Sequence, residues 1–177
     1  MTSTVLILLS LLGDAGEVVD HNDALLTGGA LAVGWGGSVA STSCLLAGVD
    51  CSTAHVGGIA ASASALAMYG GLAKIGVRAD GTLVPKKDRM ASAAALLLML
   101  HLGRDLFADL GLGVAYAWAR EPNHYSAGSH SSDSVGFAAS LQVGAYVSRH
   151  FAAVARADLT PEVPGFIDFL GGVQWTL

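Results

Sequence analysis

Apolar side chains recur at every second position through most of the C-terminal half of the chain. From Gly136 to Val147, Phe137, Leu141 and Val143 alternate with small or polar residues. The same alternation runs through Ala108–Trp118, Ala152–Leu159 and Phe169–Leu177. Because successive side chains of a β-strand point to opposite faces, these segments are predicted to be four strands, each with one apolar face.

A weaker alternation in the N-terminal half predicts four more strands. They lie at Gly29–Ala40, near His55–Ala65, near Tyr69–Arg78 and at Met90–Leu102. Within the last, Leu96–Leu100 is continuously apolar and does not alternate. The expected total is eight.

The predicted connections alternate between long and short. Short turns are expected near Ser64–Met68, Gly103–Phe107 and Ser148–His150, and longer polar segments at Ser41–Thr53, Ala79–Arg89, Arg120–Val135 and Thr160–Ile167. Long loops on one rim and tight turns on the other are typical of bacterial outer-membrane barrels, whose strands need about 9 to 11 residues to cross a bilayer. The fold class expected is therefore all-β, a closed antiparallel up-and-down transmembrane β-barrel of eight strands, with a packed interior.

Composition supports an apolar surface. Apolar residues make up 53% of the chain and charged residues 13%, about half the charged share of a soluble domain. A small helical membrane protein is the alternative, with Gly28–Ala40, His55–Val77 and Met90–Leu102 as candidate helices, although only the second is long enough and it contains Lys74. The net charge of −5 without a basic cluster argues against nucleic acid as a partner, and no motif implies a cofactor or a metal.

Aromatic residues are expected at both rims. Trp118, Phe137 and Phe169 fall at the long-loop ends of their strands, and Phe151 and Trp175 fall near the short-turn ends. Such an arrangement predicts two interfacial belts. Trp35 falls nearer the middle of its predicted strand and does not fit this pattern.

The N-terminal segment, residues 1–16, is interpreted as a secretory signal or a separate N-terminal segment, and residues 25–177 as the barrel. The apolar run Val5–Leu12 is followed by small residues up to Gly16, although no Lys or Arg precedes it. Whether Met1 to Ala15 is removed stays open. Cys44 and Cys51 lie at loop-closing distance and predict a disulfide in an oxidising compartment, with two unrelated thiols as the alternative.

With these features together, the chain resembles the small outer-membrane β-barrels typified by the transmembrane domain of outer membrane protein A. The resemblance covers residues 25–177 and is most specific in Val143–Asp158, VGAYVSRHFAAVARAD, which looks like the strand, turn and strand before the last strand. The ending Val173–Leu177 is similar to the C-terminal signal of the barrel-assembly machinery, although that signal usually ends in Phe or Trp. The resemblance implies a Gram-negative outer membrane, with its lipid bilayer and the assembly machinery as partners.

Charged residues at inward-facing positions form a first candidate site. These residues are Lys74, Arg78, Asp109, Arg156 and Asp158. An unpaired charge inside a small closed barrel is costly, so a structural network of ion pairs and hydrogen bonds is favoured over a path for protons or ions.

The segment Arg120–Val135 offers a second candidate site. Its His124-Tyr125-Ser126 resembles the His-x-Ser element of outer-membrane lipid A deacylases, another group of eight-stranded barrels. The resemblance implies His124 as base, Ser126 as nucleophile and Asp133 as the acid that orients the base. Ala127 stands where that family has Asn, and the element lies three strands too early. The sequence therefore favours a non-enzymatic barrel with a structural, adhesion or surface-interaction role, leaves its surface ligand open, and keeps the lipid hydrolase as an alternative.

Overall fold

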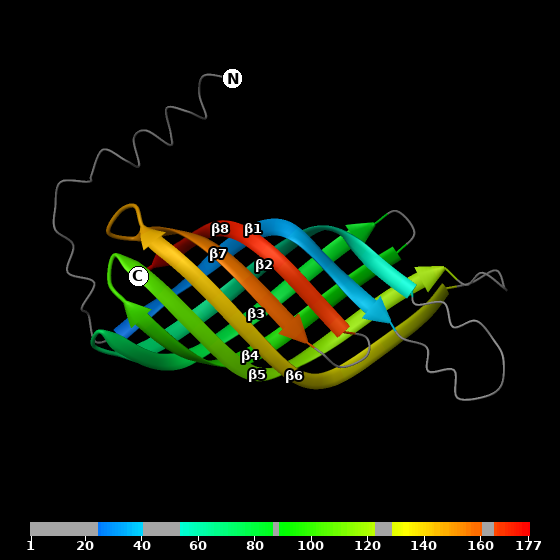
Figure 1. The fold of residues 1–177 in the computed structure, drawn as a ribbon, viewed down its shortest axis with the longest axis horizontal. Coiled ribbons are helices and arrows are strands. Elements are labelled where there is room, and N and C mark those ends of the chain that lie inside the picture. The colour runs from blue at the N-terminus through cyan, green and yellow to red at the C-terminus, as the bar shows by residue number, and fades with distance from the viewer. Residues whose placement is uncertain (1–24, 41–53, 87–88, 123–128, 161–164) are drawn as a thin grey trace, which may run out of the picture.

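A computed structural model describes residues 25–40, 54–86, 89–122, 129–160 and 165–177 of the chain. These residues form eight strands: β1 (Leu25–Ala40), β2 (Ala54–Gly70), β3 (Ala73–Lys86), β4 (Arg89–Gly103), β5 (Leu106–Pro122), β6 (Ser129–Tyr146), β7 (Phe151–Thr160) and β8 (Gly165–Thr176). The strands are tilted around a long barrel (Figure 1).

The barrel is closed and follows chain order. Each strand pairs antiparallel with the next, and β1 pairs with β8 from Gly28 opposite Thr176 to Val39 opposite Gly165. β1 therefore begins at the same end of the barrel at which β8 ends, beside the short turns (Figure 1). The predicted fold class, a closed antiparallel up-and-down barrel of eight strands, is confirmed.

The helical alternative is wrong, because its three candidate segments lie in strands. Gly28–Ala40 lies in β1, Met90–Leu102 lies in β4, and His55–Val77 runs along β2 into β3. In the described parts of the chain, the structure contains no helix with the length and apolar character needed to cross a membrane.

Several predicted boundaries are also wrong, because the strands are longer than expected. They contain between 10 residues in β7 and 18 in β6. Ser64–Met68 belongs to β2, and the turn lies at residues 71–72. Ala79–Lys86 belongs to β3, where inward Asp80 and Thr82 alternate with outward Gly81 and Leu83. Polar residues on an inward strand face give this segment the composition of a loop. For this reason the segment was predicted to be a loop, although most of it lies in β3.

Two further predicted long segments, Arg120–Val135 and Thr160–Ile167, are likewise shorter than expected, and Ser41–Thr53 lies outside the described residues. β5 continues to Pro122 and β6 starts at Ser129, so most of Arg120–Val135 is strand. Thr160 ends β7, and Ile167 already lies in β8. The turns predicted near Gly103–Phe107 and Ser148–His150 are present as bends.

Two of the turns depend on glycine. Gly70 and Gly103 have φ values of 147° and 119°, and each directly precedes a two-residue bend. A Cβ on Gly103 would lie 2.1 Å from the backbone oxygen of Leu106. Only glycine enters this region of φ without strain, so these residues fix the β2–β3 and β4–β5 hairpins.

The two faces of the barrel wall have opposite character. Large apolar side chains cover the outside, with Ile59 exposed by 78% and Leu98 by 65%, whereas Arg78 and Lys74 are each exposed by only 1% on the inside. Outside, the rings of Trp35 and Phe169 stack with centroids 6.5 Å apart. Trp35 therefore lies at the level of Phe169, which the sequence did not predict, because the β1–β8 register was unknown.

Strands β5 and β6 extend beyond β7 at the end of the barrel opposite the chain's C-terminus (Figure 1). The β6–β7 pairing ends at Ala139 opposite Leu159, whereas the β5–β6 pairing continues to Pro122 opposite Ser129. The last part of this hairpin therefore projects past β7, while β5 stays paired with β4 as far as Arg120.

Candidate functional site: the polar interior of the barrel

Four inward side chains form a closed ring of charges. Arg78 Nε donates to Asp80 Oδ2 at 2.9 Å, and Arg78 Nη2 donates to Asp158 Oδ1 at 3.3 Å. Arg156 Nη1 donates to Asp80 Oδ1 at 3.2 Å, and Arg156 Nε lies 2.7 Å from Asp158 Oδ2. We call these four residues the charged ring; each cation contacts both anions and each anion contacts both cations.

The position of the ring follows from the alternation in two strands. Arg78 and Asp80 are neighbours on the inward face of β3, and Arg156 and Asp158 occupy the same face of β7. In a closed barrel of eight strands in chain order, β3 and β7 stand on opposite sides. The ring therefore connects opposite walls across the interior, with opposite charges satisfying one another where water is scarce.

Two serines add further hydrogen bonds to the ring. Arg78 Nη2 donates to Ser140 Oγ on β6, and Arg156 Nη2 donates to Ser62 Oγ on β2. Both serines are buried. Four strands thus contribute side chains to one network, which makes rigid cross-linking of the wall its immediate physical effect.

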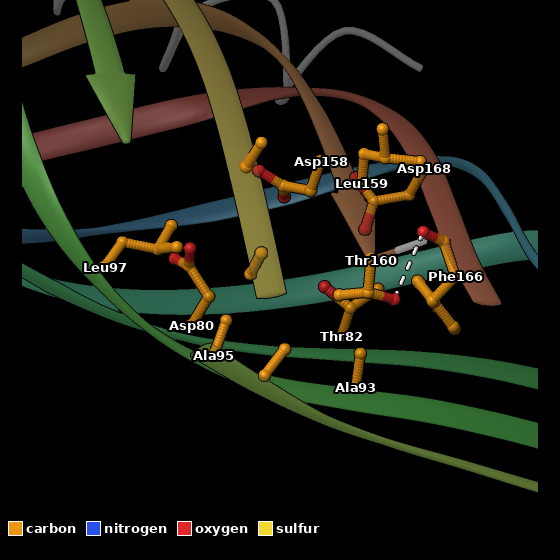
Figure 2. Close-up of a pocket in the computed structure, with 13 residues that line it drawn as sticks. Asp80, Thr82, Ala93, Ala95, Leu97, Asp158, Leu159, Thr160, Phe166 and Asp168 are labelled. Carbon is orange, nitrogen blue, oxygen red and sulfur yellow. Dashed lines mark hydrogen bonds between the residues drawn. The ribbon is translucent and has the colours of Figure 1, made fainter. Parts of the chain in front are cut away.

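A small cavity lies beside the ring. Its volume is about 20 Å³, measured as the space open to the centre of a water molecule. Asp80, Asp158 and Asp168 line it together with Thr82 and Thr160, and mainly apolar residues form the rest of its wall (Figure 2). Thr160 Oγ1 donates to the backbone oxygen of Phe166. We call this space the acidic cavity.

A second polar cluster lies inside β4, β5, β6 and β8. His101 Nδ1 lies 2.6 Å from Asp109 Oδ1, and Gln142 Nε2 donates at 2.8 Å to Asp109 Oδ2 and at 2.8 Å to Gln174 Oε1. His101 and Asp109 are exposed by 2% and 0%. Since this chain of contacts reaches from β4 to β8, it also links strands that are not neighbours in the wall.

Aromatic rings pack against this second cluster. Phe107 lies between His101 and Tyr146, with ring centroids 5.1 Å and 5.3 Å away. A Cβ on Gly144 would lie 2.3 Å from the Phe107 ring, so glycine at this position makes room for it. The Phe107 ring therefore packs against the imidazole that contacts Asp109.

Solved structures of known proteins share this architecture. The attachment invasion locus protein Ail of Yersinia pestis superposes with a TM-score of 0.54 at 10% identity, covering 85% of this chain and 99% of Ail. The N-terminal β-barrel domain of OprF from Pseudomonas aeruginosa superposes with a TM-score of 0.53 at 12% identity, covering 84% of this chain and 97% of that domain. Neisserial surface protein A superposes with a TM-score of 0.52 at 14% identity, covering 84% of this chain and 97% of that protein. The fold is that of the small eight-stranded β-barrels. No protein-family model and no curated protein sequence matches the chain.

In this eight-stranded barrel, all five residues of the predicted interior network point inward. Arg78, Arg156 and Asp158 meet in the charged ring, and Asp109 lies in the second cluster. Lys74 Nζ donates to the backbone oxygens of Gly70 and Gly71 at 3.3 and 3.0 Å. Lys74 therefore caps the β2–β3 turn.

Of the three predicted hydrolase residues, the structure describes only Asp133. His124 and Ser126 lie outside the described residues, as do Cys44, Cys51 and residues 1–16. Asp133 is exposed on β6, opposite Trp118 of β5. The catalytic role of these three residues and the disulfide stay predictions.

Three polar residues of the interior were not predicted from the sequence: Asp80 in the charged ring, Asp168 beside the acidic cavity and His101 in the second cluster. Asp80 falls in a predicted loop, and Asp168 falls just before the predicted start of the last strand. Both stand two residues from inward positions, Arg78 and Leu170, so continuing the alternation outward would have found them.

Proposed function

We propose that the protein is an integral barrel of the bacterial outer membrane, with a structural, adhesion or surface-interaction role. The observation that carries this proposal is the distribution of side chains across the wall, with Leu98 and Ile59 outside and Arg78 inside. In water the exposed apolar surface would drive aggregation. In a bilayer the same surface is solvated by lipid, and a closed barrel leaves no backbone group of the sheet unpaired.

A membrane-spanning barrel of this kind is expected to be closed to solutes. Apolar residues of the interior gather in three clusters, represented by Leu97, Val84 and Phe107, and the charged ring crosses the space among the strands. An interior filled in this way agrees with the size of an eight-stranded barrel. The proposed role therefore lies at the surface and not in conduction.

The projecting β5–β6 hairpin is the part of the barrel best placed for contacts outside the membrane. Near its end, Ser131 and Asp133 are exposed on β6. A barrel of similar fold is named for attachment and invasion, and another is named a surface protein. We further propose that the C-terminal strand, ending at Leu177, is the segment that the barrel-assembly machinery recognises.

The membrane proposal is tested by folding the full chain into detergent micelles and lipid vesicles. We expect faster gel mobility before boiling than after it, together with a β-type circular dichroism spectrum. Mobility that does not change on boiling, or a protein that stays soluble without lipid or detergent, would contradict the proposal.

The orientation of the barrel in the outer membrane is tested by labelling single cysteines with a membrane-impermeant maleimide in intact Gram-negative cells. Asp133→Cys, at the projecting hairpin, and Arg149→Cys, at an exposed bend of the opposite rim, are compared in a background with Cys44→Ser and Cys51→Ser. We expect labelling of the first in intact cells and of the second only after the outer membrane is permeabilised. The reverse result would place the β5–β6 hairpin in the periplasm and remove its surface role.

A further inference from the structure

We infer that Asp168 carries a proton in the folded barrel at neutral pH and donates a hydrogen bond to Asp158. The barrel therefore takes up one proton when it folds, and its stability depends on pH through this one residue. The inference concerns the interior of the folded barrel and does not depend on the proposed surface role.

The charged ring leaves no positive charge for Asp168. Its two guanidinium groups, those of Arg78 and Arg156, each contact both Asp80 and Asp158, so the ring is neutral by itself. In the part of the chain that the structure describes, none of these ion pairs extends to Asp168. An ionised Asp168 would thus add one uncompensated negative charge to the interior, which is costly.

The immediate surroundings of Asp168 do not stabilise an ionised carboxylate. The residue is exposed by only 1%, and its Oδ1 atom is buried without a hydrogen-bond partner. Water therefore does not solvate this oxygen, and no donor takes the place of water. A buried carboxylate in such a position takes up a proton and becomes neutral, because the cost of burying its charge is not repaid.

Among the described residues around Asp168, the charged ones come from β3 and β7. β3 contributes Arg78 and Asp80, and β7 contributes Arg156 and Asp158, all four of them already paired in the charged ring. Figure 2 shows Asp80, Asp158 and Asp168 around the acidic cavity. The described residues that face Asp168 or line this cavity from β1, β2, β4, β5 and β6 are uncharged: Gly36, Ala60, Ala93, Ala95, Leu97, Ala115, Ala138 and Ala139.

Asp158 is the acceptor for the proton of Asp168. The two residues lie directly opposite each other in the β7–β8 register, and their side chains are close enough for a hydrogen bond. Two ionised carboxylates in this arrangement repel each other, whereas a protonated carboxyl group donates to an ionised one. Asp158 keeps the negative charge because it contacts both Arg78 and Arg156, so the proton belongs to Asp168.

The sign of the pH dependence follows from the two states of Asp168. In the unfolded chain an aspartate is ionised above about pH 4, whereas in the folded barrel Asp168 keeps its proton. Since the folded state binds one proton more, stability falls as the pH rises through this range. The contribution of Asp168 to the equilibrium constant of unfolding increases about tenfold for each pH unit. The stabilisation is complete in acid and is lost once the folded barrel itself releases the proton.

The test is urea unfolding of the detergent-folded full chain from mildly acidic to alkaline pH at fixed ionic strength. Asp168→Asn has the same shape as the protonated acid, can donate to Asp158 and is neutral at every pH. We expect the unchanged protein to lose stability relative to Asp168→Asn as the pH rises, by about tenfold in the unfolding constant per pH unit. His101 and His150 are present in both proteins, so the comparison isolates Asp168. Asp133→Asn, which removes an exposed carboxylate of β6, is the control and is expected to follow the unchanged protein at each pH.

Two outcomes of the unfolding experiment would overturn the inference. A difference between the unchanged protein and Asp168→Asn that stays constant with pH would mean that Asp168 is ionised in the folded barrel. A pH-dependent difference of the same size in Asp133→Asn would mean that the effect comes from net charge and not from the interior.

Infrared spectroscopy of the unchanged, detergent-folded protein gives a direct measurement that does not require any variant to fold. We expect the carbonyl band of a protonated carboxyl group at neutral pH, and its disappearance in Asp168→Asn. A spectrum of the unchanged protein without this band would contradict the protonation of Asp168. A band that persists in Asp168→Asn would assign the proton to another residue.

Discussion

Arg78 and Asp158 are separated by 80 positions in the sequence, yet their side chains meet across the interior with Nη2 and Oδ1 3.3 Å apart. The contact joins β3 to β7, which share no hydrogen-bonded ladder. Backbone pairing holds neighbouring strands together, and this network adds links between strands on opposite sides. The charged ring is thus a tertiary element of the barrel and not a property of any one hairpin.

Removing one cation from the charged ring is expected to destabilise the barrel strongly. Arg156→Met deletes the contacts with both Asp80 and Asp158 and leaves the buried side chain of Asp80 and the partly exposed side chain of Asp158 less compensated. Breaking a buried ion pair by removing one partner costs roughly 3–5 kcal/mol. Urea unfolding in detergent, followed by tryptophan fluorescence, measures the loss.

Arg149→Met is the matched control for this substitution, because Arg149 is exposed in the bend between β6 and β7. We expect the control to change the free energy of unfolding by less than about 0.5 kcal/mol. The double variant Arg156→Met with Asp80→Asn is expected to recover part of the loss. Equal effects of Arg156→Met and Arg149→Met would show that the ring contributes no stability.

Gly103→Ala and Gly81→Ala are expected to differ although both replace glycine by the same residue. Gly103 has a φ of 119°, and a Cβ added there would lie 2.1 Å from a backbone oxygen, whereas a Cβ on Gly81 would meet no atom within 4 Å. The strained backbone is expected to cost roughly 1–3 kcal/mol at Gly103. At Gly81 the change is expected to be neutral or stabilising by about 0.4–1 kcal/mol. Equilibrium unfolding checks both, and a neutral Gly103→Ala would contradict the role of this turn.

Gln142→Leu is expected to disrupt the second polar cluster. Gln142 Nε2 donates to both Asp109 and Gln174, so its loss leaves two buried acceptors without this donor. An unsatisfied buried polar group costs roughly 1–3 kcal/mol, and more when it is charged. The double variant Gln142→Leu with Asp109→Leu removes the charged acceptor as well. If Gln142→Leu unfolds at the same urea concentration as the unchanged protein, the hydrogen bonds that Gln142 donates to Asp109 and Gln174 contribute nothing to stability.

Leu98→Arg is expected to impair insertion into lipid much more than Val135→Arg. Leu98 is exposed on the outside within β4, whereas Val135 lies on the β6 segment beyond the end of β7. An arginine facing lipid at the midplane costs roughly 2–4 kcal/mol, and near the interface about 0–1 kcal/mol. The fraction of protein folded in vesicles, read from heat-dependent gel mobility, provides the measurement. Equal folding of both variants would argue against a bilayer around Leu98.

The alternation of side chains, together with the alternating lengths of the connections, determined the fold class, and the alternation determined the facing of the four C-terminal strands. Phe137, Leu141 and Val143 were placed outside and Arg156 inside from sequence alone, because a period of two residues assigns each position to one face. Alternation does not determine register or strand ends, since polar inward residues such as Asp80 have the composition of a loop.

Only the tertiary structure decided which inward residues meet. Closure of the barrel sets β3 opposite β7, and the register of β7 with β8 places Asp168 opposite Asp158. Closure depends on the pairing of β1 with β8, which are far apart in the chain, and the β7–β8 register depends on which residues of two neighbouring strands face each other. No local pattern of apolar and polar residues encodes either. The sequence therefore determined that charges enter the interior, and the geometry of the closed sheet decided that four of them form a ring beside an acidic cavity.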